Sequence, residues 1–121
     1  MNDNRPVFSQ LMEIIENDIL SGVYKPHDLI ISTTQISKLY SVNPTTAVKA
    51  VSRLTEEGVL YKKPGIGMCV TEDAREKIFR RRQQVFLGGA IDAFLSEAAA
   101  LGISVDEIIS IIRKKDKGIN G

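Results

Sequence analysis

The sequence has few of the residues that build disulfides and metal sites. Its 121 residues include one cysteine, one histidine and no tryptophan. A single cysteine cannot form an internal disulfide, and one cysteine with one histidine cannot complete the ligand set of a zinc site. We therefore expect no metal and no cofactor. Cys69 is interpreted as a small packing residue and His27 as a solvent-facing turn residue.

Long apolar runs and a dominant charge are also missing. No apolar stretch approaches the roughly 20 residues of a membrane span, and the N-terminus has no secretion-signal pattern. We expect an intracellular, cytoplasmic protein without membrane contact. The net charge of +1 does not by itself indicate a nucleic-acid partner. Since paired carboxylates, an activated nucleophile and a phosphate-binding loop are not found either, we expect no catalytic residues and no enzyme.

Two short helical patterns with clear start signals occupy the middle of the chain. Ser32, with Gln35 three residues later, fits a capping box at the start of the first pattern, which should end near Tyr40. Asn43 is a favoured N-cap for the second, and Pro44 suits the first helical position. The few residues left between the patterns predict a tight turn, which is the spacing of a helix-turn-helix.

The second helix, predicted for residues 44–57, has two faces of opposite character. One face repeats apolar residues at helical spacing and should be buried. The other carries hydroxyls, cations and one apolar residue, a combination that can contact phosphates and base edges in the major groove. A solvated face of a small helical bundle is the alternative. The buried face consists of Ala47, Ala50, Val51 and Leu54, and the exposed face of Thr45, Thr46, Val48, Lys49, Ser52 and Arg53.

A β-hairpin is predicted for residues 59–71, directly after the helix pair. Two short apolar strands flank a turn rich in proline and glycine. Such a hairpin is a wing, and Lys62, Lys63 and Gly65 would bring charge and backbone close to DNA. A hairpin that merely covers the core is the alternative. The segment 23–31 could add a brief strand, and an amphipathic first helix from Pro6 would complete a mainly α fold with a small β-hairpin.

Together, these pieces resemble the GntR family of bacterial transcription regulators. The similarity runs from residue 6 to residue 70 and includes PVFSQLMEIIENDILSGVYKP, VNPTTAVKAVSRLTEEGVLYKK and GIGMCV. The run from Val42 to Thr46 is similar to the short YtrA-type subfamily. The resemblance implies a winged helix-turn-helix over residues 6–71 and a DNA-binding repressor of a bacterial operon, transporter operons included. We add Ser32, Thr34 and Gln35 to the candidate DNA contacts.

The sequence departs from the family at positions that contact DNA in other members. Family members often have arginines where Thr34, Pro44 and Val48 stand here, and His27 replaces a usual glycine. Because fewer cations mean fewer phosphate contacts, we expect weaker DNA binding with a shallower salt dependence.

Residues 72–117 predict a helical tail of two helices. Thr71 could cap the first helix, Gly88-Gly89 interrupts it as a kink or as a place of close packing, and Ser104 fits a second capping box. About 45 residues are too few to bury a core alone, so we expect the tail to form a homodimer with twofold symmetry. The candidate dimer residues are Ile78, Val85, Phe86, Ile91, Phe94, Leu95, Ile108, Ile109 and Ile112.

A dimer would place two reading helices about 34 Å apart, the spacing of a palindromic or near-palindromic operator in double-stranded DNA. The tail is too short for the effector domain of larger family members, so the sequence assigns no small-molecule effector. A hypothesis of another class is a winged-helix module for protein recognition with weak or no specific DNA binding, which the missing arginines favour.

Overall fold

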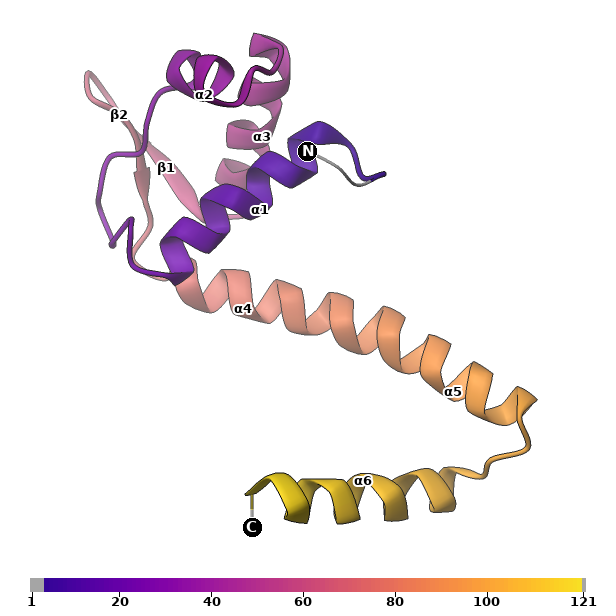
Figure 1. Cartoon of the computed structure of the whole chain (residues 1–121). Coiled ribbons are helices and arrows are strands. Elements are labelled where there is room, and N and C mark those ends of the chain that lie inside the picture. Colours follow the sequence, from indigo (N-terminus) through magenta and orange to yellow (C-terminus); the bar gives the residue numbers. More distant parts are fainter. Residues whose placement is uncertain (1–3, 121) are drawn as a thin grey trace. The chain divides into compact units, whose positions relative to one another are not determined.

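The computed structural model describes residues 4–120, which form two units on either side of the peptide bond between Arg80 and Arg81 (Figure 1). The first unit contains helices α1 (Val7–Leu20), α2 (Thr33–Tyr40) and α3 (Pro44–Glu56), strands β1 (Leu60–Lys63) and β2 (Gly67–Val70), and the start of helix α4 (Ala74–Val85). The second unit contains the end of α4, the π-helical turn η1 (Phe86–Ala90), and helices α5 (Ile91–Ala100) and α6 (Val105–Asn120).

The helix pair begins where the sequence predicts, because both N-terminal caps form. The Ser32 hydroxyl accepts the Gln35 amide at 3.1 Å, and the Gln35 side-chain oxygen accepts the Ser32 amide at 2.8 Å. At α3, the side-chain oxygen of Asn43 accepts the amide of Thr45 at 3.0 Å, and Pro44 is the first helical residue. The left-handed Ser41, with φ of 53°, turns the chain between the two helices.

The core of the first unit lies where α3 packs against both α1 and α2. The four apolar residues predicted for the buried face of α3 are all buried, and Ala47, Ala50 and Leu54 have no exposed surface. Residues of α1, including Leu11, Ile15 and Ile19, form the facing layer of the same core. The predicted fold class, mainly α with a small β-hairpin, is confirmed.

Strands β1 and β2 form an antiparallel hairpin in which Leu60 faces Val70 and Lys63 faces Gly67. The preceding segment 23–31 adds a single bridge, between Leu29 and Cys69, rather than the brief strand that we considered. The predicted packing role of Cys69 is confirmed, because only 2% of this residue is exposed.

Helix α4 begins later than the sequence suggests, and its first turns belong to the first unit. The Thr71 hydroxyl donates to the carbonyl of Gly58 at 2.7 Å, so the prediction that Thr71 caps this helix was wrong. Ala74 and Ile78 are buried in the core cluster with 1% and 0% exposure. The proposed dimer contact at Ile78 is therefore wrong as well, because this side chain fills the interior of its own unit.

The second unit continues α4 through η1 into α5 without a non-helical residue. The predicted interruption at Gly88-Gly89 is thus a widened, π-helical turn. After a turn at residues 101–104, α6 runs back at an angle to α5 (Figure 1). The Ser104 hydroxyl accepts the Glu107 amide at 3.1 Å, which is the serine half of the predicted capping box.

Within residues 4–120, no helix is both long enough and apolar enough to cross a membrane.

Candidate nucleic-acid interface

The exposed face of α3 is the centre of the candidate interface. Thr45, Val48, Lys49, Ser52 and Arg53 are all exposed, on the side of the helix opposite the buried alanine, valine and leucine stripe. Thr46, at the edge of this face, is half-buried. Because one side of α3 is fixed in the core, the other side is presented as a rigid row of hydroxyls, one isopropyl group and two cations. Such a row can contact phosphates and base edges.

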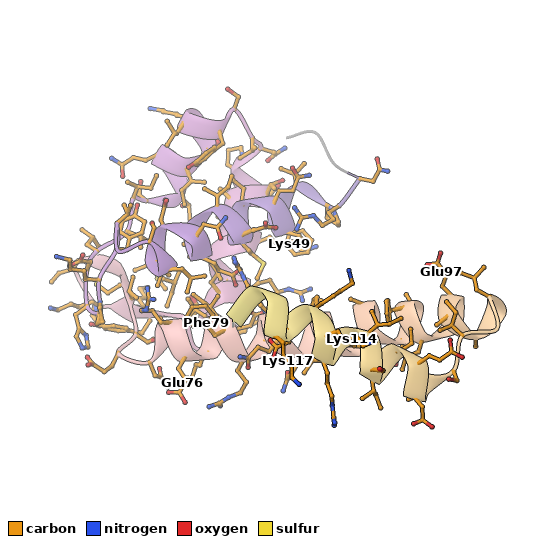
Figure 2. All side chains as sticks on the ribbon, turned by 60° about the horizontal axis from the view of Figure 1, so that its bottom comes forward. Lys49, Glu76, Phe79, Glu97, Lys114 and Lys117 are labelled. Atoms are coloured by element: carbon orange, nitrogen blue, oxygen red, sulfur yellow. The ribbon has the colours of Figure 1, made fainter. Side chains whose placement is uncertain are left out.

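The two cations of this face lie against an aromatic ring of α1. The Lys49 ammonium is 4.1 Å from the centroid of the half-buried Phe8 ring, and the Arg53 guanidinium carbon is 5.6 Å from it. The ring quadrupole attracts both cations and restricts where their side chains lie. Lys49, labelled in Figure 2, remains exposed, so its ammonium hydrogens that point away from the ring stay accessible to an anion.

The candidate contacts at the helix starts have part of their hydrogen-bonding capacity already in use. Ser32 and Gln35 bond each other's backbone amides in the capping box. The Thr45 hydroxyl donates to the side-chain oxygen of Asn43 at 2.8 Å. Thr34 is exposed beside them. The capping box uses the oxygen of the Gln35 amide and not its NH₂ group, so this NH₂ group can donate to a phosphate at the start of α2.

The hairpin presents a basic strand that leads into a glycine-containing turn. Lys62 and Lys63, at the end of β1, are exposed, as is the turn Pro64, Gly65 and Ile66. The turn closes with a bond from the Ile66 amide to the Lys63 carbonyl at 3.0 Å, and Gly65 adopts a positive φ of 78° that favours glycine. This arrangement suits the wing role predicted for Lys62, Lys63 and Gly65.

His27 is exposed, as predicted, but it also links three segments of the first unit. One ring nitrogen lies 3.0 Å from the Tyr61 hydroxyl on β1, and the other lies 2.7 Å from a Glu72 carboxylate oxygen before α4. Desolvation raises the pKa of Tyr61, and the neighbouring Cys69 adds to the shift.

Sequence reasoning missed the positioning roles of Phe8 and of the His27 cluster. The apolar pattern of the first helix indicates Phe8 only as a core-facing residue and does not indicate its contacts with Lys49 and Arg53. Its place in the first turn of that helix is the available signal, because Phe8 is only partly buried against the core and its ring is open to other side chains. For His27, Tyr61 and Glu72 no local signal exists, since the three residues are far apart in the sequence and meet only through the hairpin.

The candidate dimer residues other than Ile78 all belong to the second unit. Only Ile108 among them is buried, with 9% exposure. The others are exposed, with Val85 at 70% and Leu95 at 38% as the extremes. The exposed candidates are Val85, Phe86, Ile91, Phe94, Leu95, Ile109 and Ile112.

Comparison with known proteins connects this geometry to a family. The model of the family described as bacterial regulatory proteins, gntR family, matches residues 8–70. The transcriptional repressor YtrA of Bacillus subtilis is 21% identical over 116 residues, which are 96% of this chain and 88% of YtrA. The regulator GgaR of Escherichia coli K12 is 30% identical over 90 residues, which are 72% of this chain but only 36% of GgaR. These relatives are transcription regulators, not enzymes.

Solved structures show the same architecture. A GntR family regulator from Bacteroides thetaiotaomicron, 29% identical, superposes with a TM-score of 0.77 over 93% of this chain and 97% of its own. The GntR family regulator YtrA from Sulfolobus acidocaldarius, 24% identical, superposes with a TM-score of 0.56 over 100% and 97% of the two chains. BusR of S. agalactiae, whose structure contains its promoter DNA, is 20% identical and has a TM-score of 0.58 over 96% and 57%.

Proposed function

The chain belongs to the GntR family of bacterial regulatory proteins and is a DNA-binding transcription regulator, and we propose that it is a homodimeric repressor of a bacterial operon. Helix α3 enters the major groove of a palindromic or near-palindromic operator, and the hairpin of β1 and β2 acts as the wing. Because its target is chromosomal DNA, the protein works in the cytoplasm.

The observation that supports this proposal most strongly is the division of α3 into two faces. Ala47, Ala50 and Leu54 are completely buried, whereas Lys49 and Ser52 are exposed on the opposite side. A helix in a helix-turn-helix must be held in this way to enter a groove as a rigid body. Lys49 can reach a phosphate or a guanine, and the Ser52 hydroxyl can hydrogen-bond to a phosphate or a base. The Val48 side chain can contact a thymine methyl.

The wing and the start of α2 supply contacts that hold the protein in register. Lys62 and Lys63 bind phosphates, and the Gly65 turn lets the backbone approach the minor groove. The Ser32, Thr34 and Gln35 group contacts the backbone beside the reading helix. Thr34, Pro44 and Val48 stand where other family members often have arginines, so this protein neutralises fewer phosphates. Its affinity for DNA therefore falls less steeply with salt than the affinity of arginine-rich members.

Dimerisation is required because one helix reads too few base pairs for operator recognition. The second unit supports a dimer, since its large hydrophobic side chains are mostly exposed in the single chain. Exposed apolar patches of this extent mark protein–protein interfaces. A twofold dimer presents two copies of α3 to successive turns of the duplex, which explains the preference for a palindrome.

Binding to the protein's own promoter region tests the proposal. Fluorescence anisotropy at physiological salt should show tighter binding to this DNA than to a scrambled duplex of equal length. The double variant Lys49→Ala/Lys62→Ala should bind more weakly while its sedimentation coefficient remains that of the dimer. The matched control is Lys25→Ala/Lys77→Ala, which removes two lysines of the first unit that lie outside α3 and the hairpin. Unchanged affinity of the first double variant would contradict the assigned face.

The same assay distinguishes this function from the alternative, a winged-helix module that recognises proteins instead of DNA. Val48 is 50% exposed and Leu39 is 65% exposed, and these apolar side chains on the helix pair favour such a module as the alternative. A protein-recognition module would not distinguish the promoter from the scrambled duplex.

A further inference from the structure

The apolar surface of the second unit is too large for the unit itself to cover. Of its described apolar side chains, Ala98 and Ile108 are buried, with 7% and 9% exposure. Both are within six residues of the turn at 101–104, so the helices meet near the turn and leave their apolar faces open farther along. Eleven large hydrophobic residues are exposed: Val85, Phe86, Leu87, Ile91, Phe94, Leu95, Leu101, Val105, Ile109, Ile111 and Ile112.

The charges of this unit are divided between its two ends. The acidic residues Asp92, Glu97, Asp106 and Glu107 lie on α5 and at the start of α6, toward the turn. The basic residues lie toward the opposite end, where α4 enters the unit and α6 finishes. Figure 2 shows Glu97 near the turn, and Lys114 and Lys117 farther along α6. The basic residues are Arg81, Arg82, Arg113, Lys114, Lys115 and Lys117, with Asp116 among them.

The glycine pair lies midway along the continuous helix, and none of the described residues packs against it. A Cβ atom at Gly88 or Gly89 would meet nothing within 4 Å. Each glycine in a helix interior costs about 1 kcal/mol relative to alanine. Because no described residue from outside this helix lies at this point, the missing side chains leave room for another backbone to approach closely.

From these observations we infer that a second copy packs antiparallel on the second unit, with the twofold axis passing between Gly88 and Gly89. This inference rests on the proposed dimeric function and specifies its arrangement. Antiparallel packing places the acidic turn end of each copy beside the basic end of the other, and it sets glycine against glycine at the crossing point. Parallel packing would bring like charges together at both ends, which costs free energy.

Helix geometry favours the same arrangement. Arg81, where the first unit is attached, is 7.5 residues from the midpoint between Gly88 and Gly89. At 1.5 Å per residue, an antiparallel crossing separates the two attachment points by about 22 Å along the helix, whereas a parallel pair would bring them within about 10 Å. The larger separation leaves more room for two DNA-binding units to occupy half-sites about 34 Å apart.

Cysteine cross-linking tests the axis directly. In a Cys69→Ala background, Gly89→Cys places two thiols beside the axis, so mild oxidation should convert most of the protein into a covalent dimer. Leu101→Cys is the control: it is 69% exposed, but an antiparallel crossing holds its two copies about 38 Å apart, beyond the reach of a disulfide. A dimer that cross-links through residue 101 as readily as through residue 89 would overturn the antiparallel arrangement.

Substitution of the glycines provides a second test. Gly88→Leu should preserve or raise helix content by circular dichroism, because leucine favours helices, while the dimer dissociation constant rises at least about tenfold. Gly118→Leu is the matched control, since Gly118 also lies in a helix with open space around it and should leave dimerisation unchanged. A Gly88→Leu dimer as tight as wild type would contradict the crossing at the glycine pair.

These outcomes are distinguishable from failure of the proposed function. If the protein binds its promoter as a dimer but does not cross-link through residue 89, the proposed function stands and the antiparallel arrangement is wrong. If the protein is monomeric at all accessible concentrations and does not bind promoter DNA, the proposed function and the proposed arrangement are both wrong.

Discussion

The Lys49 ammonium lies 4.1 Å from the centroid of the Phe8 ring, so a residue of α1 holds the central cation of the proposed reading face. This contact restricts the lysine before DNA arrives and lowers the entropy cost of fixing it on binding.

Replacing this ring should therefore weaken DNA binding without unfolding the protein. Phe8→Leu keeps apolar volume but removes the quadrupole that holds Lys49 and Arg53. A cation–π contact at an exposed site contributes about 0.5–1 kcal/mol, so we expect promoter affinity to fall about two- to fivefold by anisotropy. Tighter binding by Phe8→Leu would mean that the ring competes with DNA for Lys49, which is the opposite of the positioning role.

Substitutions on the buried face of α3 should affect stability, whereas substitutions on its exposed face should affect DNA binding. Leu54 has no exposed surface, and Leu54→Ala should lower the free energy of unfolding by about 2–5 kcal/mol. Ser52→Ala, on the exposed face, should change stability by less than about 0.5 kcal/mol and yet weaken promoter binding. Urea unfolding at one fixed protein concentration measures the first effect and anisotropy the second. Equal destabilisation by both substitutions would argue that the face bearing Ser52 is not free.

Arg75 anchors the start of α4 to the end of α1. Its guanidinium donates to the carbonyls of Ile19, at 3.3 Å, and Leu20, and it lies 5.7 Å from the Phe79 ring centroid. These carbonyls are at the C-terminal end of α1, where a cation also opposes the helix dipole. Arg75→Gln should lower the free energy of unfolding by about 1–2 kcal/mol.

The control for Arg75 is Arg80→Gln. Arg80 pairs with Glu76 at 2.7 Å on an exposed surface of the same helix. Such pairs contribute about 0.3–0.5 kcal/mol, so the urea midpoint should hardly move. Similar shifts for the two variants would show that the α1 contact adds nothing beyond a surface ion pair.

The position of His27 should prefer glycine over alanine. Its φ of 70° lies in the left-handed region, which costs a residue with a Cβ about 1–2 kcal/mol. His27→Gly and His27→Ala lose the same contacts with Tyr61 and Glu72. The difference between their free energies of unfolding therefore measures the cost of the left-handed backbone conformation. We expect the glycine variant to unfold at a higher urea concentration than the alanine variant. The reverse order would contradict this backbone conformation.

Local signals made most of the first unit predictable. The capping box of Ser32 and Gln35, the Asn43 cap and the period of the α3 stripe each involve residues within about two helical turns, so their physics is contained in the sequence. The contacts between Lys49 and Phe8, and between His27 and Glu72, join segments that meet only after folding. No sequence period indicates them.

The tail shows the other limit of sequence reasoning. An amphipathic pattern indicates which residues avoid water, but it does not identify what covers them. Ile78 and Val85 have the same apolar character, yet Ile78 packs into its own unit whereas Val85 is 70% exposed. The boundary between covered and exposed falls where α4 leaves the core near Arg80, and only the tertiary structure reveals this position.

Base discrimination is the property that the exposed face of α3 must confer if it reads the operator. Wild type, Lys49→Ala and Lys62→Ala are titrated against the promoter operator and every single-base substitution of it at one fixed salt concentration. We predict that Lys49→Ala relaxes discrimination at specific positions, by about 1–3 kcal/mol at a contacted base pair, whereas Lys62→Ala weakens binding to all sequences almost equally. An unchanged discrimination profile for Lys49→Ala would contradict the claim that this face of α3 reads the operator.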